Sequence, residues 1–329
     1  MNAKALFENF KDKKILVIGD VMIDAYIYGG VSRISPEAPV PIVNWSRSEE
    51  RLGGAANVAL NIKSLGAKPI LCSTVGKDSN GERFLNLLEE EGLPNNGIFQ
   101  VKDKLTTVKT RIIGNHQQLL RIDEEEISFL VKEQEEEFLG MIQELMATGI
   151  DAIVFEDYNK GLLTDSLIRK CIQLANDLNI ITTVDPKKDN FFSYQNVTLF
   201  KPNLKELKEG LGVTFDIKTE FNLFEKAIQD LENKLGNKLS FVTLSEHGVY
   251  IKEGVESVLI PAHIRNISDV SGAGDTVISV ATLCLAVGAS PEVAASIANL
   301  AGGLVCEKTG VVPIDKNQLF DEVIKQYGE

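Results

Sequence analysis

The sequence is poor in cysteine and histidine and has no long apolar run, and each absence excludes a class of protein. Its 4 cysteines are scattered without a CxxC pair, so neither a disulfide framework nor a zinc site is indicated. The 3 histidines have no metal-ligand spacing either. The uncharged stretches are shorter than the ~20 residues of a membrane span, and the N-terminal segment lacks the apolar core of a signal peptide. We therefore expect a cytoplasmic protein with buried, reduced thiols and no membrane partner.

Basic residues are also outnumbered. The chain has 34 lysines and arginines against 47 acidic residues, which gives a net charge of −13. A net-negative surface repels nucleic acid, which is therefore excluded as a general partner, but a local basic pocket can still bind a small phosphorylated ligand. Hydrophobic residues at 44% and charged residues at 25% are typical of a soluble globular protein. With no repeat and no flexible linker, residues 1–329 are expected to form a single domain.

Short β-branched runs alternate with longer helical patterns along the chain. The predicted strands are nearly continuous apolar runs: 15–19, 70–74, 152–155, 181–184, 198–200 and 241–244. The predicted helices are 55–65, 81–91, 132–146, 165–178, 205–210, 220–235, 275–287, 291–308 and 316–326. Strands that are apolar throughout are typical of a parallel sheet covered on both faces. The pattern predicts an α/β fold with a doubly wound, mostly parallel sheet between helices.

Two segments do not follow this alternation. Residues 22–50 contain three prolines and no helical period, and residues 98–122 read as extended around a turn at Gly114-Asn115. Both are expected to form a small second sheet outside the main one. Such a sheet is either a lid over a binding cleft or an ordinary β-excursion, and the pattern alone leaves both open.

The strongest local signal is a Gly-Ala-Gly run, residues 272–274, followed by Asp275 and a long uncharged stretch. Backbone amides at the start of such a helix bind anions. Asp275 is then either a plain N-terminal helix carboxylate or a general base beside an anion site. The second interpretation fits phosphoryl transfer to a hydroxyl group. No GxGxxG or GxxxxGK[ST] motif is present, which argues against dinucleotide oxidoreductases and P-loop NTPases.

Three weaker patterns also suggest ligand binding. Paired glycines followed by Asn57 open a helix, where a ligand can approach the backbone closely. Asn203 and Glu206 are three residues apart and are expected on one helix face, where their oxygens suit Mg²⁺ held through waters. Asp24 follows the first strand, at the edge where open α/β sheets bind ligands, and is expected to accept hydrogen bonds from sugar hydroxyls.

Taken together, these motifs resemble those of the ribokinase-like, or phosphofructokinase-B-type, carbohydrate kinases. Their order matches along nearly the whole chain: Asp24, Gly53-Gly54 with Asn57, Asn203 with Glu206, Thr243–Gly248 and Gly272–Asp275. One departure is Ser245, at a position where the family commonly has glycine. The resemblance implies the doubly wound fold with a small β-sheet lid, ATP as phosphoryl donor and Mg²⁺ as cofactor.

The resemblance also implies a role for each matching residue. Asp275 would be the base, and the anion hole would comprise Gly272, Ala273 and Gly274. The nucleotide site would be lined by Lys201, Asn203, Glu206, Thr243, Ser245, Gly248 and Asn299. Asn203 and Glu206 would order Mg²⁺ through waters, and a monovalent cation such as K⁺ would bind at Asp269 and Ser271. The sugar would contact Asp24, Gly53, Gly54 and Asn57.

Within this family the chain is most similar to the group that acts on D-glycero-β-D-manno-heptose 7-phosphate. The segments that carry this similarity are 32–41, 53–59, 115–123, 157–161, 185–187 and 201–203. It implies phosphorylation of the anomeric hydroxyl to the 1,7-bisphosphate, for lipopolysaccharide or surface-glycan heptose. Many such proteins carry a second, nucleotidyltransferase domain, and the resemblance leads us to expect the kinase alone in this chain. The substrate 7-phosphate needs a cation, and the candidates are Arg33, Arg121, Lys160 and Lys187.

Two other functions stay open at this point. One is a kinase of the same fold for another sugar, sugar phosphate or nucleoside. The other is a catalytically inactive sugar-binding regulator, although an intact Gly-Ala-Gly-Asp element speaks against it. Family members often dimerise through the lid sheet, so a homodimer is indicated by the apolar lid residues Ile27, Val40 and Ile42.

Overall fold

The computed structural model describes residues 2–115, 117–263 and 265–328, and in this part of the chain nine strands form one central sheet. Residue 116, which falls within the predicted lid segment, lies outside the described residues. The strand order is β13-β12-β11-β10-β9-β8-β1-β4-β5, parallel from β11 to β5 and antiparallel at β12 and β13. The strands are β1 (Lys14–Gly19), β4 (Lys68–Gly76), β5 (Ile98–Val101), β8 (Ala152–Glu156), β9 (Ile181–Asp185), β10 (Leu199–Phe200), β11 (Leu239–Thr243), β12 (Val249–Glu253) and β13 (Glu256–Ile260).

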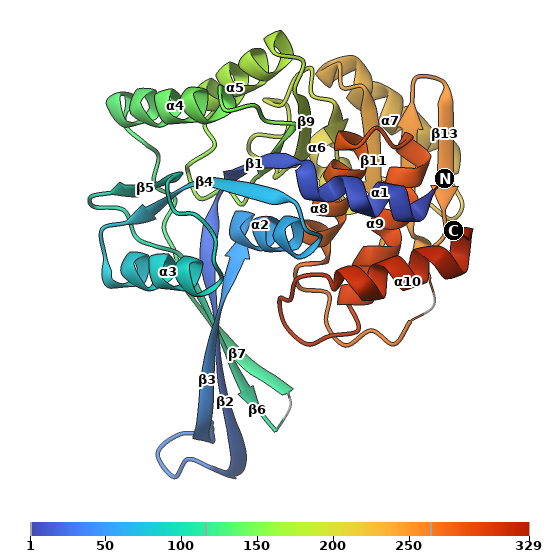
Figure 1. Cartoon of the computed structure of the whole chain (residues 1–329). Helices are drawn as coiled ribbons and strands as arrows, with labels where there is room; N and C mark the ends of the chain where they lie inside the picture. Colours follow the sequence, from blue (N-terminus) through green and yellow to red (C-terminus); the bar gives the residue numbers. More distant parts are fainter. Residues whose placement is uncertain (1, 116, 264, 329) are drawn as a thin grey trace.

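Helices cover both faces of this sheet (Figure 1). One face packs against α1 (Ala3–Asn9), α2 (Ala55–Ser64), α3 (Ser79–Glu90), α8 (Ala273–Ala286), α9 (Pro291–Val305) and α10 (Lys316–Tyr327). The other packs against α4 (Lys132–Met146), α5 (Asp165–Asp177), α6 (Leu204–Leu211) and α7 (Phe221–Leu235). Side chains of β1 alternate between the two cores: Ile15 and Val17 enter one, Leu16 and Ile18 the other. This confirms the predicted doubly wound α/β sandwich.

A second sheet leaves the body as a narrow ribbon (Figure 1). In the described residues it has four strands in the order β3-β2-β6-β7, namely β2 (Val21–Ile34), β3 (Pro41–Gly54), β6 (Val108–Gly114) and β7 (Gln117–Glu124). The predicted small sheet is confirmed, but its predicted start at residue 98 is wrong. Residues 98–101 form β5 and extend the main sheet beside β4, because a short apolar run gives no sign of which sheet it joins. We call β2, β3, β6 and β7 the lid sheet.

The predicted helices all occur, and their caps explain where two of them begin. Thr164 and Ser290 accept hydrogen bonds from backbone amides in the first turns of α5 and α9. The sequence prediction missed α1 and the hairpin of β12 and β13, which are short. All four cysteines are free and buried, as expected. Across the three described ranges, no helix combines the length and apolarity that a membrane crossing requires.

Candidate active site

The entrance to α8 supplies a short run of backbone amides. Gly272 is the N-cap residue and has φ +78°, a left-handed conformation that favours glycine. The helix begins at Ala273, two residues before the predicted start at Asp275. The amide of Ala273 donates to the carbonyl of Val270 at 3.3 Å. The amides of Gly274 and Asp275 belong to the first turn, whose donors have no acceptor within the helix, so they can face an anion.

Asp275 is buried, with 4% of its surface exposed, and is held through both carboxylate oxygens. The side-chain amide of Asn57 donates to Oδ2 at 2.7 Å, and the hydroxyl of Tyr158 donates to Oδ1 at 2.9 Å. Burial raises the pKa of Asp275 to about 6, and the nearby Asp185 carboxylate adds to the rise, while both hydrogen bonds oppose it. A carboxylate with this pKa is ionised at neutral pH and close to the ideal strength for a general base.

Three neighbouring parallel strands place charged side chains beside this base. Glu156 and Asp185 end β8 and β9, and Lys201 follows β10. Oxygens of Glu156, Asp185 and Asp275 all lie within 4.8 Å of one another. Lys201 Nζ lies 2.7 Å from Asp185 Oδ2 and neutralises part of this negative charge. Burial, with the charges of Asp185 and Asp275, raises the pKa of Glu156 well above its ordinary value, so its protonated form is favoured.

A cavity of about 1040 Å³ opens in front of these groups. The predicted residues among its lining are Gly272, Gly274, Asp275, Lys187, Lys201, Asn203, Glu206, Thr243 and Ser245. The structure therefore brings the predicted base and anion hole together with most of the predicted nucleotide site. The predicted residues outside this lining are Ala273, Gly248, Asn299, Asp269, Ser271, Asp24, Gly53, Gly54, Asn57, Arg33, Arg121 and Lys160.

Asn203 and Glu206 do not share a helix face as expected, because Asn203 is the N-cap of α6 and not part of the helix. They form a capping box: Asn203 Oδ1 accepts from the Glu206 amide and Glu206 Oε2 accepts from the Asn203 amide, both at 2.8 Å. The other Glu206 oxygen pairs with Lys187 Nζ at 2.6 Å. Both residues line the cavity, and their side-chain oxygens suit the hydration shell of a hard cation.

The turn between β11 and β12 explains why glycine is common at the position of Ser245. Ser245 has φ +53°, in the left-handed region where the resembling kinases commonly have glycine. Gly248 has φ +86°, and a Cβ there would lie 2.0 Å from the Ile260 carbonyl oxygen, so only glycine fits. Asn299, from α9, donates to the carbonyl of Pro261 at 2.9 Å, close in sequence to the end of β13.

Asp24 does not lie in a loop beyond a strand, as the sequence suggested, but within β2 of the lid sheet. It is buried and forms an ion pair with Arg111 of β6, which sequence reasoning missed. The strand alternation was the available signal, since it places Lys109 and Arg111 on the same face. A Cβ at Gly53 would lie 2.2 Å from Asp24 Oδ2, so the glycine makes room for this carboxylate. Gly54 has φ +62° and turns the chain into α2.

Asn57 is fully buried behind the base and bonds to Asp275. Its predicted contact with a sugar stays a prediction, but its contact with Asp275 gives it a second role. A Cβ at Gly272 would lie 2.9 Å from Asn57 Nδ2. Asn57 therefore packs directly against the entrance to α8.

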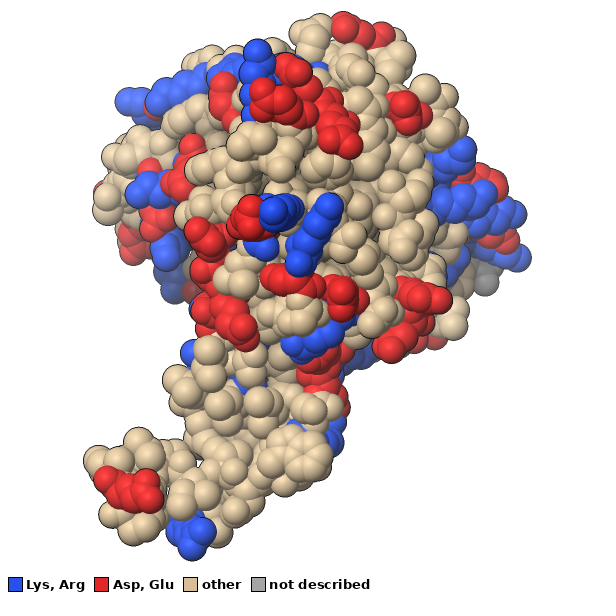
Figure 2. All heavy atoms as spheres, turned by 90° about the vertical axis from the view of Figure 1, so that its left-hand side faces the viewer, with Lys and Arg blue, Asp and Glu red and all other residues tan. Residues whose placement is uncertain are grey.

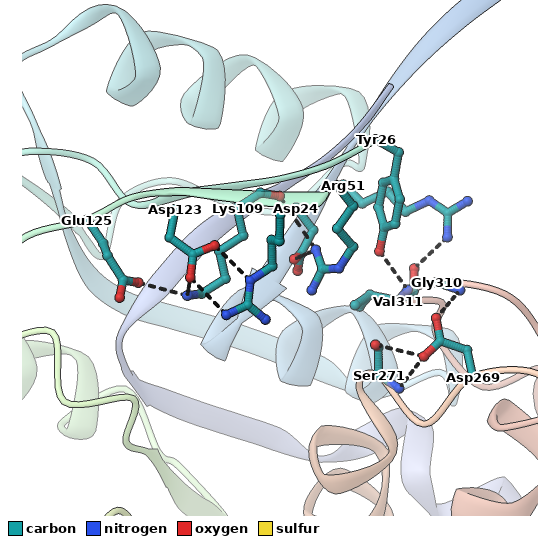
Figure 3. Close-up of polar contacts among 12 residues, drawn as sticks. Asp24, Tyr26, Arg51, Lys109, Asp123, Glu125, Asp269, Ser271, Gly310 and Val311 are labelled. Atoms are coloured by element: carbon teal, nitrogen blue, oxygen red, sulfur yellow. Dashed lines mark hydrogen bonds and ion pairs between the residues drawn. The ribbon is translucent and has the colours of Figure 1, made fainter. Parts of the chain in front are cut away.

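The base of the lid is tied to the body at Val311 (Figure 3). Arg51 Nη1 donates to the carbonyl of Val311 at 3.0 Å, and the Val311 amide donates to the hydroxyl of Tyr26 at 3.2 Å. Arg51 also lies over the Tyr26 ring, 5.1 Å from its centroid. These contacts fix the foot of β2 and β3 against the body.

The predicted monovalent-cation residues lie beside this junction (Figure 3). Asp269 Oδ1 accepts from the Ser271 hydroxyl at 2.8 Å, and Oδ2 accepts from the Gly310 amide at 2.9 Å. These bonds and the charge of Arg111 hold the pKa of Asp269 below its ordinary value, although burial opposes this. The carboxylate is therefore charged at neutral pH, as cation binding requires.

Two of the four predicted phosphate-binding cations lie away from the lid base. Arg33 is exposed near the end of β2. Lys187 lines the cavity, where its ion pair with Glu206 and the charge of Asp185 raise its pKa despite burial. Lys187 therefore faces the predicted nucleotide site.

The other two candidates join a charged cluster at the base of the lid sheet. Lys160 Nζ lies 3.0 Å from Glu125, and Arg121 Nε lies 2.8 Å from Asp123. Lys109, which sequence reasoning missed, pairs with both acids, at 2.7 Å from Glu125 and 3.3 Å from Asp123 (Figure 3). Lys109 and Lys160 are largely shielded from solvent, with 14% and 16% of their side chains exposed.

A doubly wound body, a β-sheet lid and a buried carboxylate at a glycine-rich helix entrance define a ribokinase-like carbohydrate kinase site. Residues 12–317 match the pfkB family of carbohydrate kinases, and the chain belongs to this family. It is 40% identical over 298 residues to the bifunctional protein HldE of Helicobacter pylori strain J99, covering 91% of this chain and 64% of that protein. HldE of Magnetococcus marinus is 39% identical over 315 residues, with coverage of 94% and 64%.

Solved structures of the same fold are more distant in sequence. Phosphofructokinase-2 from Escherichia coli in complex with potassium superposes with a TM-score of 0.76 at 19% identity, over 95% of this chain and 99% of that chain. Ribokinase from Thermotoga maritima superposes with a TM-score of 0.70 at 19% identity, over the same shares. These superpositions confirm the ribokinase-like fold.

Proposed function

We propose that this chain is an ATP-dependent kinase that phosphorylates the anomeric hydroxyl of D-glycero-β-D-manno-heptose 7-phosphate. The product is the 1,7-bisphosphate, a precursor of heptose in lipopolysaccharide or another surface glycan. The observation that carries the proposal is Asp275, held by Asn57 and Tyr158 at the amide-rich entrance to α8 and open to the cavity. The heptose assignment is supported by the similarity to HldE and by the segments that resemble heptose 7-phosphate kinases.

Each group in the proposed reaction has a place in this geometry. Asp275 accepts the proton of the anomeric hydroxyl while the sugar oxygen forms a bond to the γ-phosphorus of ATP. The bond from that phosphorus to the β–γ bridging oxygen breaks, and ADP leaves with the electron pair. Backbone amides of Gly274 and Asp275 stabilise the charge on the transferred phosphoryl oxygens. Asp275 then releases its proton to solvent.

The nucleotide phosphates are proposed to lie along the cavity wall formed by Lys201, Asn203 and Glu206. Oxygen ligands of this kind fit Mg²⁺. The side-chain oxygens of Asn203 and Glu206 already accept hydrogen bonds or pair with Lys187, so we expect them to contact the waters that Mg²⁺ coordinates and not the ion itself. Mg²⁺ supplies charge neutralisation between the phosphates when bound. K⁺ is proposed at Asp269 and Ser271.

Glu206→Gln should raise the Mg²⁺ concentration needed for half-maximal activity about tenfold and lower turnover, because residues that orient metal-bound groups affect metal affinity on this scale. The glutamine oxygen can still cap α6, but its amide cannot pair with Lys187. Sugar affinity should change little. Magnesium titration of both proteins measures the effect, with Glu225→Gln on α7, outside the cavity lining, as the matched control. Superimposable titration curves for Glu206→Gln and the parent would contradict the assignment.

The substrate 7-phosphate is proposed to bind at Lys109 and Lys160, at the base of the lid sheet. These two cations come from β6 and from the segment after β8, and Glu125 bridges them. Arg111, two residues along the same face of β6, reaches Asp24. The lid base therefore offers the Asp24 carboxylate for sugar hydroxyls and two cations, Lys109 and Lys160, for a phosphate.

The lid sheet should close over the bound sugar and exclude water that would otherwise accept the phosphoryl group. Adding heptose 7-phosphate with a nonhydrolysable ATP analogue should slow amide hydrogen exchange in residues 21–54 and 108–124. The foot of the lid, fixed by Arg51 and Tyr26, should change less than the distal strands. Hydrogen-exchange mass spectrometry with each ligand alone is the control. Protection confined to residues 240–310 would argue against closure.

The lid is also the proposed interface of a homodimer. Figure 2 shows it as a projecting arm, and on the face in view few charged side chains lie between its base and its tip. The large apolar side chains exposed on it are Ile34, Val40, Trp45, Leu119, Leu120 and Ile122. Trp45, the chain's single tryptophan, is 67% exposed, which is unusual because tryptophan side chains are mostly buried in folded proteins. A second copy would cover these side chains.

A coupled assay of ADP release across a panel of acceptors tests the proposed function. The panel is heptose 7-phosphate, unphosphorylated heptose, fructose 6-phosphate, ribose and adenosine. We expect turnover on heptose 7-phosphate to exceed that on every other acceptor by a wide margin. Efficient use of ribose or adenosine with heptose 7-phosphate ignored would leave a kinase but reject the heptose assignment. If no acceptor in the panel supported ADP release, the proposed kinase activity would be rejected.

A further inference from the structure

The segment after β8, residues 157–163, is held rigidly by two buried carboxylates. Asp20 directly follows β1 and is 3% exposed. Its Oδ2 accepts from the backbone amides of Tyr158 and Lys160, each at 3.0 Å, and its Oδ1 accepts from the Leu162 amide at 3.3 Å. The loop therefore wraps around one carboxylate, which fixes the backbone that carries Tyr158.

The second carboxylate, Asp157, anchors the same segment to the core under α4–α7, to which its partner Tyr194 belongs. Asp157 Oδ2 accepts from the Tyr194 hydroxyl at 2.8 Å and from the Asn190 side-chain amide at 3.0 Å. Tyr194 is fully buried. With its backbone fixed on both sides, Tyr158 has little freedom to move away from the active site.

Tyr158 uses this fixed backbone to reach the base. Its hydroxyl donates to Asp275 Oδ1 at 2.9 Å, and its ring lines the cavity. Lys187 Nζ lies 5.3 Å from the ring centroid, on the side of the predicted nucleotide site. Tyr158 thus stands between the base and a cation, in contact with Asp275 and within reach of a bound substrate.

The charges around Asp275 make a second hydrogen-bond donor important. Asp185 faces it from β9 and opposes its ionisation, while Lys201, after β10, favours it; Glu156, which faces it from β8, is itself held towards its protonated form. From α2 the neutral Asn57 donates to Oδ2, so Tyr158 supplies the donor for the remaining oxygen. Burial and the charge of Asp275 raise the pKa of Tyr158 well above its ordinary value, so it keeps its proton and stays a donor.

We propose that Tyr158 is a positioning residue for the general base: its hydroxyl fixes the orientation of Asp275 and favours the charged carboxylate that accepts the sugar proton. This inference rests on the proposed kinase function. The proton transferred in the reaction goes to Asp275 and not to Tyr158, which donates the same hydrogen bond before and after the step.

Tyr158→Phe removes only the hydroxyl and should move the acid limb of the pH profile of kcat/KM upward by about one unit, since a hydrogen bond to a charged group contributes on this scale. On the alkaline plateau, where Asp275 is ionised in both proteins, kcat should fall less than tenfold and the KM for the sugar should stay the same. The measurement is kcat and KM from pH 5 to 9 on the best acceptor of the panel.

Tyr194→Phe is the matched control. It removes a tyrosine hydroxyl from a carboxylate of the same segment without touching Asp275. It should lower the melting temperature and leave the acid limb in place. A Tyr158→Phe protein with the parent's acid limb, or with an equal loss at every pH, would overturn the inference while the parent's activity still supports the kinase. A parent with no activity on any acceptor would overturn both.

Discussion

Asp275→Asn should abolish most turnover, by about 10²–10⁴-fold, because the sugar hydroxyl would lose its general base. The fold and nucleotide binding should persist. The asparagine oxygen can accept from Asn57 while its amide donates to the hydroxyl oxygen of Tyr158, so both partners stay satisfied. Steady-state kinetics and titration calorimetry with an ATP analogue check these outcomes. A variant within threefold of the parent rate would exclude Asp275 as the base.

The same substitution makes a prediction about stability. The pKa of Asp275 in the folded protein, about 6, lies above its ordinary value of 3.8 because of burial. As pH rises from about 4 to 6 the unfolded chain loses this proton first, so the carboxyl group's contribution to the free energy of unfolding falls over that range. At pH 7 the neutral asparagine should therefore give an equal or higher melting temperature.

Asp165→Asn is the matched control for both effects. Asp165 also lies in the first turn of a helix, α5, but it pairs at the surface with Arg169. If Asp275 were only a helix N-terminal carboxylate, the two substitutions would have similar effects. We expect Asp165→Asn to leave turnover unchanged.

Replacing the lysines at the lid base should remove the preference for a phosphorylated sugar. Lys109→Met and Lys160→Met should each lower kcat/KM for heptose 7-phosphate by about 10–100-fold, since a hydrogen bond to a charged group is worth ~1.5–3 kcal/mol. Turnover on unphosphorylated heptose should be little affected, because that sugar has no phosphate for these lysines to bind and both already pair with Glu125. Parallel kinetics on the two sugars measure the change in preference.

Two further lysine and arginine variants separate this site from the other candidates. Arg33→Met, near the exposed end of β2, should leave both sugars unaffected. Lys187→Met should raise the KM for ATP and spare the sugar preference, because Lys187 pairs with Glu206 at the nucleotide side. If the preference for heptose 7-phosphate persisted in Lys109→Met and Lys160→Met but was lost in Lys187→Met, the 7-phosphate would have to bind near Lys187 and not at the lid base.

The parts of the fold that follow from local chemistry could be predicted from the sequence. Continuous apolar runs identified the body strands, and glycines with an adjacent carboxylate identified the entrance to α8. The edge strand β5 was assigned to the wrong sheet because Ile98–Val101 is as apolar as a lid strand. Whether a short strand joins the body or the lid depends on its neighbours in space, which the sequence does not list.

The sequence could predict those site residues that a local motif identifies, but not the contacts between residues that are far apart in the chain. Asp275 was identified by its neighbours in sequence, whereas Tyr158 reaches it from 117 positions away. Arg111 likewise meets Asp24 across 87 positions. Asn203 and Glu206 were recognised as a pair, but their capping box depends on the helix starting at Leu204, a boundary that the sequence pattern placed one residue later. Pairings of this kind are set by the packing of separate elements.

Phosphorus NMR of the product formed from ATP and heptose 7-phosphate tests the central claim most directly. If Asp275 deprotonates the anomeric hydroxyl, ATP should be converted to ADP while the sugar gains one new phosphate whose phosphorus couples to the anomeric proton. The original 7-phosphate signal should persist in equal amount, and over the same reaction time Asp275→Asn should form about 10²–10⁴-fold less of the new phosphate. A new phosphate on any other carbon, or a sugar left unchanged by the parent protein, would contradict the account.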